Sequence, residues 1–326
     1  MKSILKRTLL ALTSLLLLTS CASGGTAETT DASDTNADTT PEAVTQAPLT
    51  PAVPPSDTQI ANHESILLWP EDNFPYLIEN DEKGLMPTIR AYLCDGADAA
   101  VVIFPGGGYF QLSDVSEGVD IAKAYNDAGY SAFVVNYRYE PYDGRATLAD
   151  GQRAVQYVRY FANTFGIDPD KIALCGFSAG GHLSVMVAEH PVTDNLAKDA
   201  IGMTRSTPDA CILAYPVTTL GEGTFETMPR IFLGENMNNA AEIAKYSYPH
   251  ALDTMPPTFV FYSVKDYFVN YAANSIAFAD AMRKADRDVV IRAYTDGGHG
   301  IGLGTAYPDY AHWHAESVAF LRERGF

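Results

Sequence analysis

The segment that most constrains this chain is residues 172–183, where Gly-Phe-Ser-Ala-Gly at 176–180 stands between a strand-like run and a helix-like run. A G-x-S-x-G sequence in that setting is typical of a sharp turn that lifts the serine hydroxyl above the sheet edge. Side chains at the two glycine positions would crowd the turn. The helix that follows points free backbone N–H groups toward the serine, where they can stabilise an oxyanion. Ser178 is therefore a candidate nucleophile, and the amide of Ala179 is a candidate oxyanion donor.

Strand-like and helix-like segments alternate from about residue 60 to the C-terminus, which predicts βαβ units and a mostly parallel sheet of about eight strands. The first two strands are expected to form an antiparallel edge. The predicted strands are residues 66–69, 88–93, 99–104, 130–137, 171–175, 209–215, 258–264 and 289–294. The predicted helices are residues 116–128, 147–165, 178–189, 270–285 and 310–324.

Two further side chains follow predicted strands directly, as Ser178 does. Sites in such sheets lie beyond the carboxyl ends of the strands. His299 stands in a glycine-rich loop after the last strand and is the candidate base, since a serine hydroxyl needs a base to accept its proton. Asp266 follows the predicted strand at 258–264 and is the candidate carboxylate that orients the imidazole. The three residues then occur along the chain in the order Ser, Asp, His. Asp296 is the alternative carboxylate, although a side chain there would instead cap its own loop.

A run of three glycines follows the strand at 99–104. Backbone without side chains can approach a substrate closely, so Gly107 and Gly108 join Ala179 as candidate oxyanion-hole donors. An ordinary loop is the alternative interpretation. A phosphate-binding loop is not favoured, because the run lacks both the G-x-G-x-x-G spacing and a P-loop lysine.

Together these motifs resemble the α/β-hydrolases of the esterase/lipase superfamily. They are most similar to the group related to hormone-sensitive lipase and to bacterial acetyl-xylan and feruloyl esterase-like (BD-FAE-like) domains. The residues that carry the resemblance are Phe104-Pro105-Gly106-Gly107-Gly108-Tyr109, Glu117-Gly118, Asn136-Tyr137-Arg138-Tyr139, Asp150 with Arg153-Ala154, and the runs 166–172 and 176–183. Pro105 departs from the lipase pattern, which has histidine at this position.

The resemblance covers roughly residues 60–326 and implies an α/β-hydrolase fold with helices on both faces of the sheet. It also implies a triad of Ser178, Asp266 and His299 that forms an acyl-enzyme, without a metal or an organic cofactor. The expected substrates are small acyl esters, acetyl esters above all, on carbohydrates or polysaccharides. Two alternatives stay open: a serine peptidase of the same fold, and a non-catalytic surface lipoprotein that only binds.

The N-terminus has the pattern of a bacterial lipoprotein signal, with Lys2, Lys6 and Arg7 before a short apolar run. A small residue then precedes Cys21, which resembles the position that becomes lipidated; an ordinary cleaved signal peptide is the alternative. Residues 22 to about 57 are rich in Thr, Ala, Asp, Ser and Pro, a composition typical of disorder. We therefore expect a signal peptide at 1–20, a tether at 21–58 and a catalytic domain at 59–326, held by its lipid anchor on the outer side of the bacterial membrane.

Charge and cysteine content narrow the choice of partners. The formal net charge is −18 and no basic stripe is present, which argues against nucleic acid as a partner. Cys94, Cys175 and Cys211 are expected to be free thiols, although one disulfide is possible, and no Cys/His cluster has metal-ligand spacing. Residues 216–257 form an insertion that is either a small helical cap over the serine or ordinary core packing. The sequence leaves the oligomeric state open.

Overall fold

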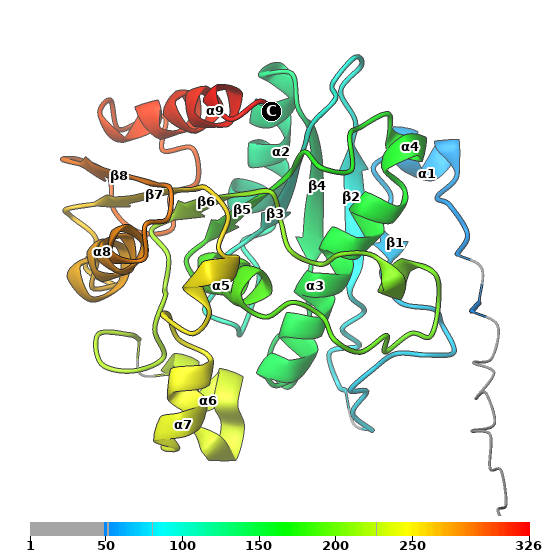
Figure 1. The fold of residues 1–326 in the computed structure, drawn as a ribbon, viewed down its shortest axis with the longest axis horizontal. Helices are drawn as coiled ribbons and strands as arrows, with labels where there is room; N and C mark the ends of the chain where they lie inside the picture. Colours follow the sequence, from blue (N-terminus) through cyan, green and yellow to red (C-terminus); the bar gives the residue numbers. More distant parts are fainter. Residues whose placement is uncertain (1–48, 51, 80, 226) are drawn as a thin grey trace, which may run out of the picture. The chain divides into compact units, whose positions relative to one another are not determined.

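One sheet of eight strands organises the residues that the computed structural model describes, which are 49–326 except 51, 80 and 226 (Figure 1). The strand order is β1-β2-β4-β3-β5-β6-β7-β8. β2 pairs antiparallel with β1 and β4, and every other pairing is parallel, as the sequence predicted. The strands are β1 (Ile66–Leu67), β2 (Thr88–Tyr92), β3 (Ala100–Phe104), β4 (Ser131–Asn136), β5 (Ile172–Phe177), β6 (Ala210–Ala214), β7 (Thr258–Ser263) and β8 (Val289–Tyr294).

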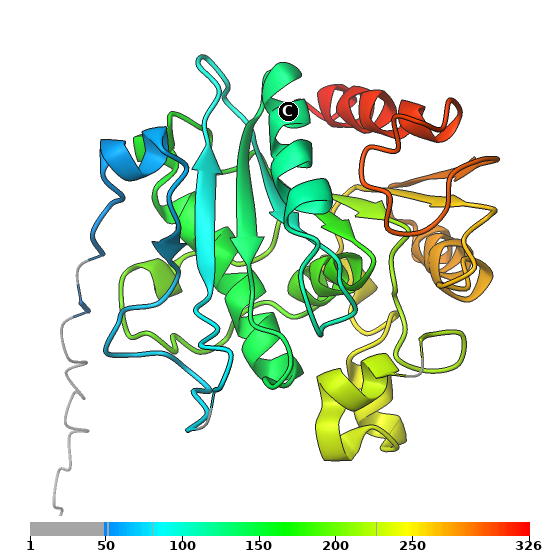
Figure 2. The ribbon, with the colours of Figure 1, turned by 180° about the vertical axis from the view of Figure 1, so that it is seen from behind.

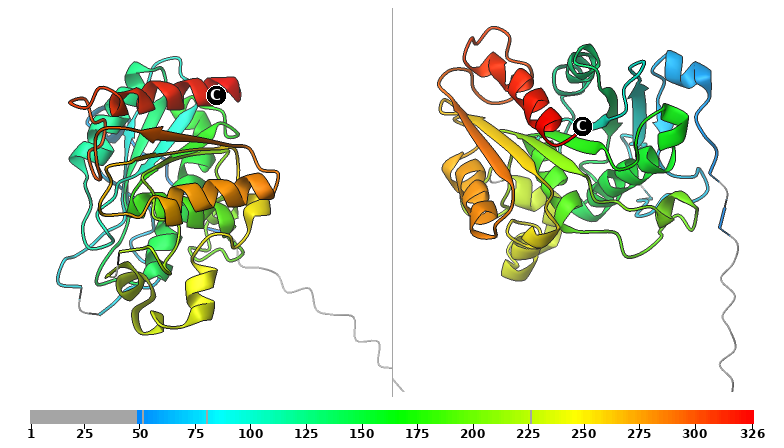
Figure 3. Two further views of the ribbon diagram at one scale, coloured as in Figure 1. Left: turned by 90° about the vertical axis from the view of Figure 1, so that its left-hand side faces the viewer. Right: turned by 45° about the horizontal axis from the view of Figure 1, so that its top comes forward.

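Helices cover both faces of the sheet, so the predicted fold class is confirmed. The α-helices are α1 (Asp57–Ala61), α2 (Asp120–Asp127), α3 (Gly144–Tyr160), α4 (Ala162–Phe165), α5 (Ala179–Glu189), α6 (Thr227–Leu233), α7 (Ala240–Lys245), α8 (Ala277–Lys284) and α9 (Trp313–Glu323). Single turns of π-helix, η1 (Val115–Val119) and η5 (Ala272–Ile276), and of 3₁₀-helix, η2 (Ile201–Met203), η3 (Gly234–Asn236), η4 (Leu252–Thr254) and η6 (Tyr310–His312), complete the helical structure. α3 and α5 lie in front of the sheet in Figure 1, α2 lies in front of it in Figure 2, and Figure 3 shows β8 between α8 and α9.

Each face of the sheet has its own hydrophobic core because strand side chains alternate between the two faces. In β3, Val102 and Phe104 belong to the core that residues of α3, α5 and α8 share, whereas Val101 and Ile103 belong to the core that residues of α2 and α9 share. All five residues of β3 are fully buried. An apolar run without alternation is therefore what a parallel strand covered on both sides requires.

Several element boundaries differ from the predictions. The helix predicted from residue 147 begins at Gly144, because the carboxylate of Asp143 caps the amide of Arg145. The helix predicted over 116–128 opens with the π-helical turn η1 before α2. The first strand ends at Leu67, two residues early, and the indole N–H of Trp69 donates to the buried carboxylate of Asp150 at 2.7 Å.

The last residues of the predicted tether belong to the folded unit. Thr50 forms a parallel bridge with Asp199, Pro55 is buried, and Ser56 caps α1 through a reciprocal bond with Gln59. The folded region therefore begins before the predicted boundary at residue 59. The predicted signal peptide, Cys21 and the rest of the tether lie outside the described residues.

The insertion at 216–257 is helical and also packs into the core, so it combines both predicted alternatives. α6 and α7 lie beyond the carboxyl ends of the parallel strands (Figure 1). Phe232 of α6 packs at ring-centroid distances of 5.0 to 5.3 Å from His182, Tyr109 and Tyr246. Phe225 and Met228, from the same insertion, line the hollow above Ser178.

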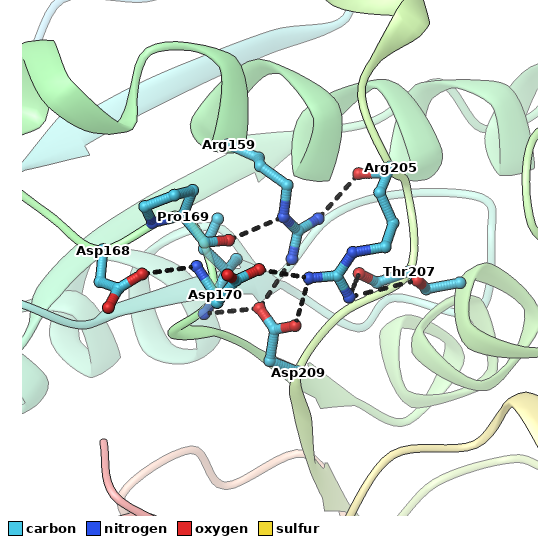
Figure 4. A network of polar contacts seen from close by, with 8 residues as sticks. Arg159, Asp168, Pro169, Asp170, Arg205, Thr207 and Asp209 are labelled. Carbon is cyan, nitrogen blue, oxygen red and sulfur yellow. Dashed lines mark hydrogen bonds and ion pairs between the residues drawn. The ribbon is translucent and has the colours of Figure 1, made fainter.

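At the edge of the sheet away from Ser178, an ionic network joins the amino-terminal ends of β5 and β6 to the end of α3 (Figure 4). The guanidinium of Arg159 donates to the Pro169 carbonyl at 2.8 Å and to the Asp209 carboxylate at 2.7 Å. Asp209 also accepts from the amide of Ile172 and from Arg205. This network sets the start of the strand that carries Ser178 at its other end.

The cysteines and helices of the described region bear on the expectations for disulfides, metal sites and membrane spans. Cys94, Cys175 and Cys211 are free, and the latter two are buried, as the sequence predicted. Within residues 49–326, as far as they are described, no group of three or more His, Cys, Asp and Glu side chains could hold a metal ion. None of the helices in that same region is long and apolar enough to cross a bilayer.

Among the ion pairs of the described residues, Arg138–Asp150 is the most deeply buried. Its side chains are 1% and 0% exposed. The carboxylate accepts from the Arg138 backbone amide, from Nε and Nη2 on one edge of its guanidinium, and from the Trp69 indole. Every polar atom of this carboxylate is therefore satisfied without water, and removing its charge would leave a cation in the core.

We expect Asp150→Asn to lower the free energy of unfolding by about 3–5 kcal/mol, because it leaves Arg138 buried without a counter-charge. Urea unfolding followed by circular dichroism measures this change. Asp280→Asn is the matched control: its pair with Arg283 is half exposed, so its cost is expected to stay below about 1 kcal/mol. An equal loss of unfolding free energy in the two variants would contradict a special role of the buried Asp150 charge in stability.

Candidate active site

Ser178 occupies a strained turn between β5 and α5. Its backbone has φ 51° and ψ −112°, and its amide donates to the Ala214 carbonyl at 3.0 Å. A non-glycine residue pays about 1–3 kcal/mol for such a conformation, which persists only where packing enforces it. The packing is visible at Gly180, where a Cβ would lie 2.0 Å from the Phe104 carbonyl oxygen, and at Gly176, where it would lie 2.2 Å from the Ser184 hydroxyl. The two glycines of the motif thus allow the strand to run directly into the helix.

Asp266, His299 and Ser178 form one line of hydrogen bonds. His299 Nε2 lies 2.8 Å from Ser178 Oγ, and His299 Nδ1 lies 2.7 Å from Asp266 Oδ2. The other oxygen of Asp266 accepts the amides of Phe268 and Val269, each at 2.9 Å. The carboxylate is thereby held by its own loop on one side and presents a single oxygen to the imidazole. The structure brings together these three side chains from positions 121 and 33 residues apart in sequence.

Asp296, the alternative carboxylate, has other partners. Its two oxygens accept the amides of Asp309 and Tyr310 at 3.1 and 2.8 Å. It therefore holds the start of η6 and does not bond the imidazole. This is the loop-capping role that the sequence suggested for it.

The glycine run places backbone amides beside Ser178. Gly107 and Gly108 have φ values of 134° and 64°, which L side chains rarely adopt. Among the described residues, the structure provides no acceptor for the amides of Gly107, Gly108 or Ala179. Both glycines line the same hollow as Ser178 and His299. Unpaired amides beside a hydroxyl are free to bind an oxygen that carries negative charge.

The hollow above Ser178 has a volume of about 190 Å³ and is mostly apolar. Its apolar walls come from the insertion and from the loop after β7, and they are Val217, Phe225, Met228, Phe268 and Val269. Phe268 is 68% exposed, and its ring centroid lies 5.9 Å from that of His299. The rim of the hollow therefore offers an aromatic ring to solvent next to the imidazole.

His182 is a buried link in the first turns of α5. Its Nε2 donates to the Tyr246 carbonyl and its Nδ1 accepts from the Tyr109 hydroxyl, both at 2.8 Å. Burial lowers the pKa of His182 to about 4, so the ring stays neutral at ordinary pH and makes one bond at each nitrogen. His182 thus connects the glycine loop, α5 and the insertion.

Sequence reasoning assigned no role to two residues at this site, Glu117 and Tyr215. Glu117 Oε2 accepts the Gly106 amide at 2.8 Å, and Glu117 Oε1 accepts the Tyr215 hydroxyl at 2.6 Å. Glu117 lines the hollow although it is 1% exposed. The available signal was positional: Tyr215 follows β6 directly, at the edge where the other site residues gather.

Comparison with known proteins gives one family. The model of the family described as BD-FAE matches residues 94–282, which is more than half of the chain. The acetyl ester-xyloside bifunctional hydrolase of Caldicellulosiruptor lactoaceticus is similar in structure, with a TM-score of 0.76 and 31% identity. That alignment covers 81% of this chain and 97% of the other.

Two curated relatives are longer proteins. An acetylxylan esterase of Xylanibacter ruminicola is 32% identical over 210 residues, which is 63% of this chain and 42% of the relative. An endo-1,4-beta-xylanase B of Butyrivibrio fibrisolvens is 32% identical over 244 residues, 72% of this chain and 37% of the relative. The chain thus spans about two fifths of the length of these relatives.

Proposed function

Because this chain belongs to the BD-FAE family of α/β-hydrolases, we propose that it is a serine esterase that removes small acyl groups, acetyl above all, from carbohydrate esters. The observation that carries the proposal is the hydrogen-bonded line from Asp266 through His299 to Ser178. A hydroxyl, an imidazole and a carboxylate in this order activate a serine for acyl transfer. The unpaired amides of Gly107, Gly108 and Ala179 supply the oxyanion hole.

The proposed reaction has two halves. Ser178 Oγ attacks the ester carbonyl while His299 Nε2 accepts its proton, and the Asp266 carboxylate stabilises the imidazolium. The tetrahedral oxyanion binds the three amides. Its collapse breaks the bond to the alcohol, which leaves with the proton from His299. Water then attacks the acyl-enzyme with His299 as base, and the acid and free Ser178 result.

The size of the hollow supports a small acyl group. Its volume of about 190 Å³ is below the roughly 300–1,000 Å³ of pockets that enclose drug-sized ligands. We propose that the acyl group lies against Val217 and Met228, while the sugar lies on the exposed ring of Phe268. The names of the acetylxylan esterase and acetyl ester-xyloside hydrolase relatives support a xylan-type sugar.

We also propose that the protein is an exported lipoprotein of the bacterial cell surface or periplasm, anchored through Cys21. Support comes from the sequence: the basic residues Lys2, Lys6 and Arg7, the short apolar run after them, and the small residue before Cys21. A tether of polar residues would let the enzyme reach polymeric substrates outside the cell.

For the reaction, Ser178→Ala is expected to lower hydrolysis of a short-chain aryl ester by about 10⁴-fold or more, and Asp266→Asn by about 10³–10⁴-fold. Asp296→Asn is the matched control and should keep most of the activity, because Asp296 bonds only loop amides. Purified wild-type enzyme without ester turnover would favour the alternative of a surface lipoprotein that only binds. Faster cleavage of peptide amides than of esters would favour a peptidase.

For the substrate, we expect acetate to be released from acetylated xylo-oligosaccharides faster than ferulate from feruloylated ones. Phe268→Ala should raise KM for the acetylated oligosaccharide about two- to tenfold through lost ring stacking, and should leave KM for a simple alkyl acetate unchanged. Tyr267→Ala is the matched control, since Tyr267 is 90% exposed and does not line the hollow. An equal rise in KM for both substrates would show that Phe268 does not bind the sugar.

For localisation, cells fed a labelled fatty acid should label the wild-type protein and Cys94→Ser but not Cys21→Ser, because only a cysteine at the signal boundary is lipidated. The Cys21→Ser protein should also be absent from the membrane fraction. Label retained in Cys21→Ser would exclude Cys21 as the anchor.

A further inference from the structure

We propose that Glu117 is a positioning residue of this esterase: it ties the oxyanion loop (residues 105–114, between β3 and η1) to the histidine loop (residues 295–309, between β8 and η6) and places a second carboxylate in the hollow that His299 lines. The inference rests on the proposed function and adds a residue that the proposed reaction steps do not use. It is carried by a buried carboxylate that has polar partners on both sides of the active site and no ion-pair partner among the described residues.

One oxygen of Glu117 holds the oxyanion loop. Oε2 accepts the amide of Gly106 at 2.8 Å, directly before Gly107 and Gly108. The Gly106 carbonyl accepts the amide of Ser113, so Gly106 is held at both its N–H and its C=O, and the second bond fixes the peptide that carries the Gly107 amide. The fit is tight, since a Cβ at Gly106 would lie 2.7 Å from Glu117 Oε2. The amides that bind the oxyanion therefore take their orientation from this carboxylate.

The other oxygen reaches the histidine loop through Tyr215. Oε1 accepts the Tyr215 hydroxyl at 2.6 Å, and that hydroxyl accepts the amide of Gly302 at 3.3 Å. The ring of Tyr215 packs against the ring of His299 with centroids 4.8 Å apart. Tyr215 thus contacts the imidazole through its ring and the loop that carries the imidazole through its hydroxyl.

The charge of Glu117 is not neutralised by a basic residue. Burial raises its pKa, while the bonds from Tyr215 and Gly106 and the nearby His299 lower it. The other titratable groups that face it are Tyr137, Tyr310 and Cys175, and Asp114 on its own turn pairs with Arg90. His299 is consequently the one group facing Glu117 in this described part of the chain that gains positive charge during the proposed reaction. Glu117 and Asp266 both favour that imidazolium.

Simple packing does not account for a carboxylate at this position. Burying a carboxylate without a cation is costly, and an apolar side chain of the same size would fill the space at lower cost. Two accepted bonds offset part of that cost. We infer that the rest of this cost is tolerated because the junction of the two loops needs a negative charge and two acceptor atoms.

The test compares Glu117→Gln with wild type in kcat, KM and pH profile. Glutamine keeps the shape and one acceptor but loses the charge. We expect kcat for a short-chain ester to fall about 10- to 100-fold through misplaced oxyanion amides, with KM little changed. We also expect the acid limb of kcat/KM to move to lower pH, because without the nearby negative charge protonation of the imidazole is less favourable. A purely structural role would not move that limb.

Two more variants keep the test decisive. Tyr215→Phe removes the link to the histidine loop and leaves the Gly106 bond intact. Because both residues act through one linkage, the loss of kcat in the double variant should be smaller than the sum of the losses in Tyr215→Phe and Glu117→Gln. Glu189→Gln is the matched control, a buried glutamate at the far end of α5 that accepts the His250 amide. It should leave the pH profile unchanged.

The outcomes separate the two proposals. Absence of ester turnover in the wild type would overturn the proposed function itself. An active wild type with normal kcat and an unmoved acid limb in folded Glu117→Gln would overturn the positioning role alone. Should Glu117→Gln not fold, additive losses for Tyr215→Phe combined with Glu117→Asp would overturn it equally.

Discussion

The active edge of this protein depends on the close approach of two backbones, the first turn of α5 and the carboxyl end of β3. Gly180 lies so near the Phe104 carbonyl that a single methyl group would collide with it. The helix begins one residue after Ser178, and that serine has a positive φ, a conformation that persists only where the surrounding packing holds it. The same contact brings the glycine run after β3 next to the hydroxyl. One close contact between the two backbones therefore places the proposed nucleophile beside the proposed oxyanion donors.

Around this contact, polar side chains are held by hydrogen bonds from separate segments of the chain. Asp266 uses one oxygen for the amides of its own loop and the other for His299. Glu117 and His182 do the same on either side of the glycine run, each with two partners from separate segments. Buried polar groups with complete hydrogen bonding specify a single geometry, because every alternative leaves a group unsatisfied. Such preorganisation is what acyl transfer requires at its charged intermediate.

Much of the fold could be predicted because periodicity is local. The parallel strands at 100–104 and 172–177 read as continuous apolar runs, and helices of amphipathic spacing separate them. The positions of Ser178, Asp266 and His299 followed from the rule that parallel strands end at one edge of a sheet. Boundaries were less predictable where contacts come from elsewhere in the chain: β1 stops two residues before its predicted end, and Trp69 beyond it donates to Asp150, 81 residues away.

The sequence by itself determined the sheet, the order of its elements and the candidate nucleophile, acid and base, since each depends on residue type and on spacing along the chain. Only the tertiary structure decided that Asp266 and not Asp296 bonds the imidazole, that residues 216–257 contribute to the walls of the hollow, and that Glu117 and Tyr215 join the two loops. The physical reason is that hydrogen bonds and contacts of this kind join residues tens to hundreds of positions apart. Their partners are set by how the whole chain packs and leave no periodic trace in the sequence.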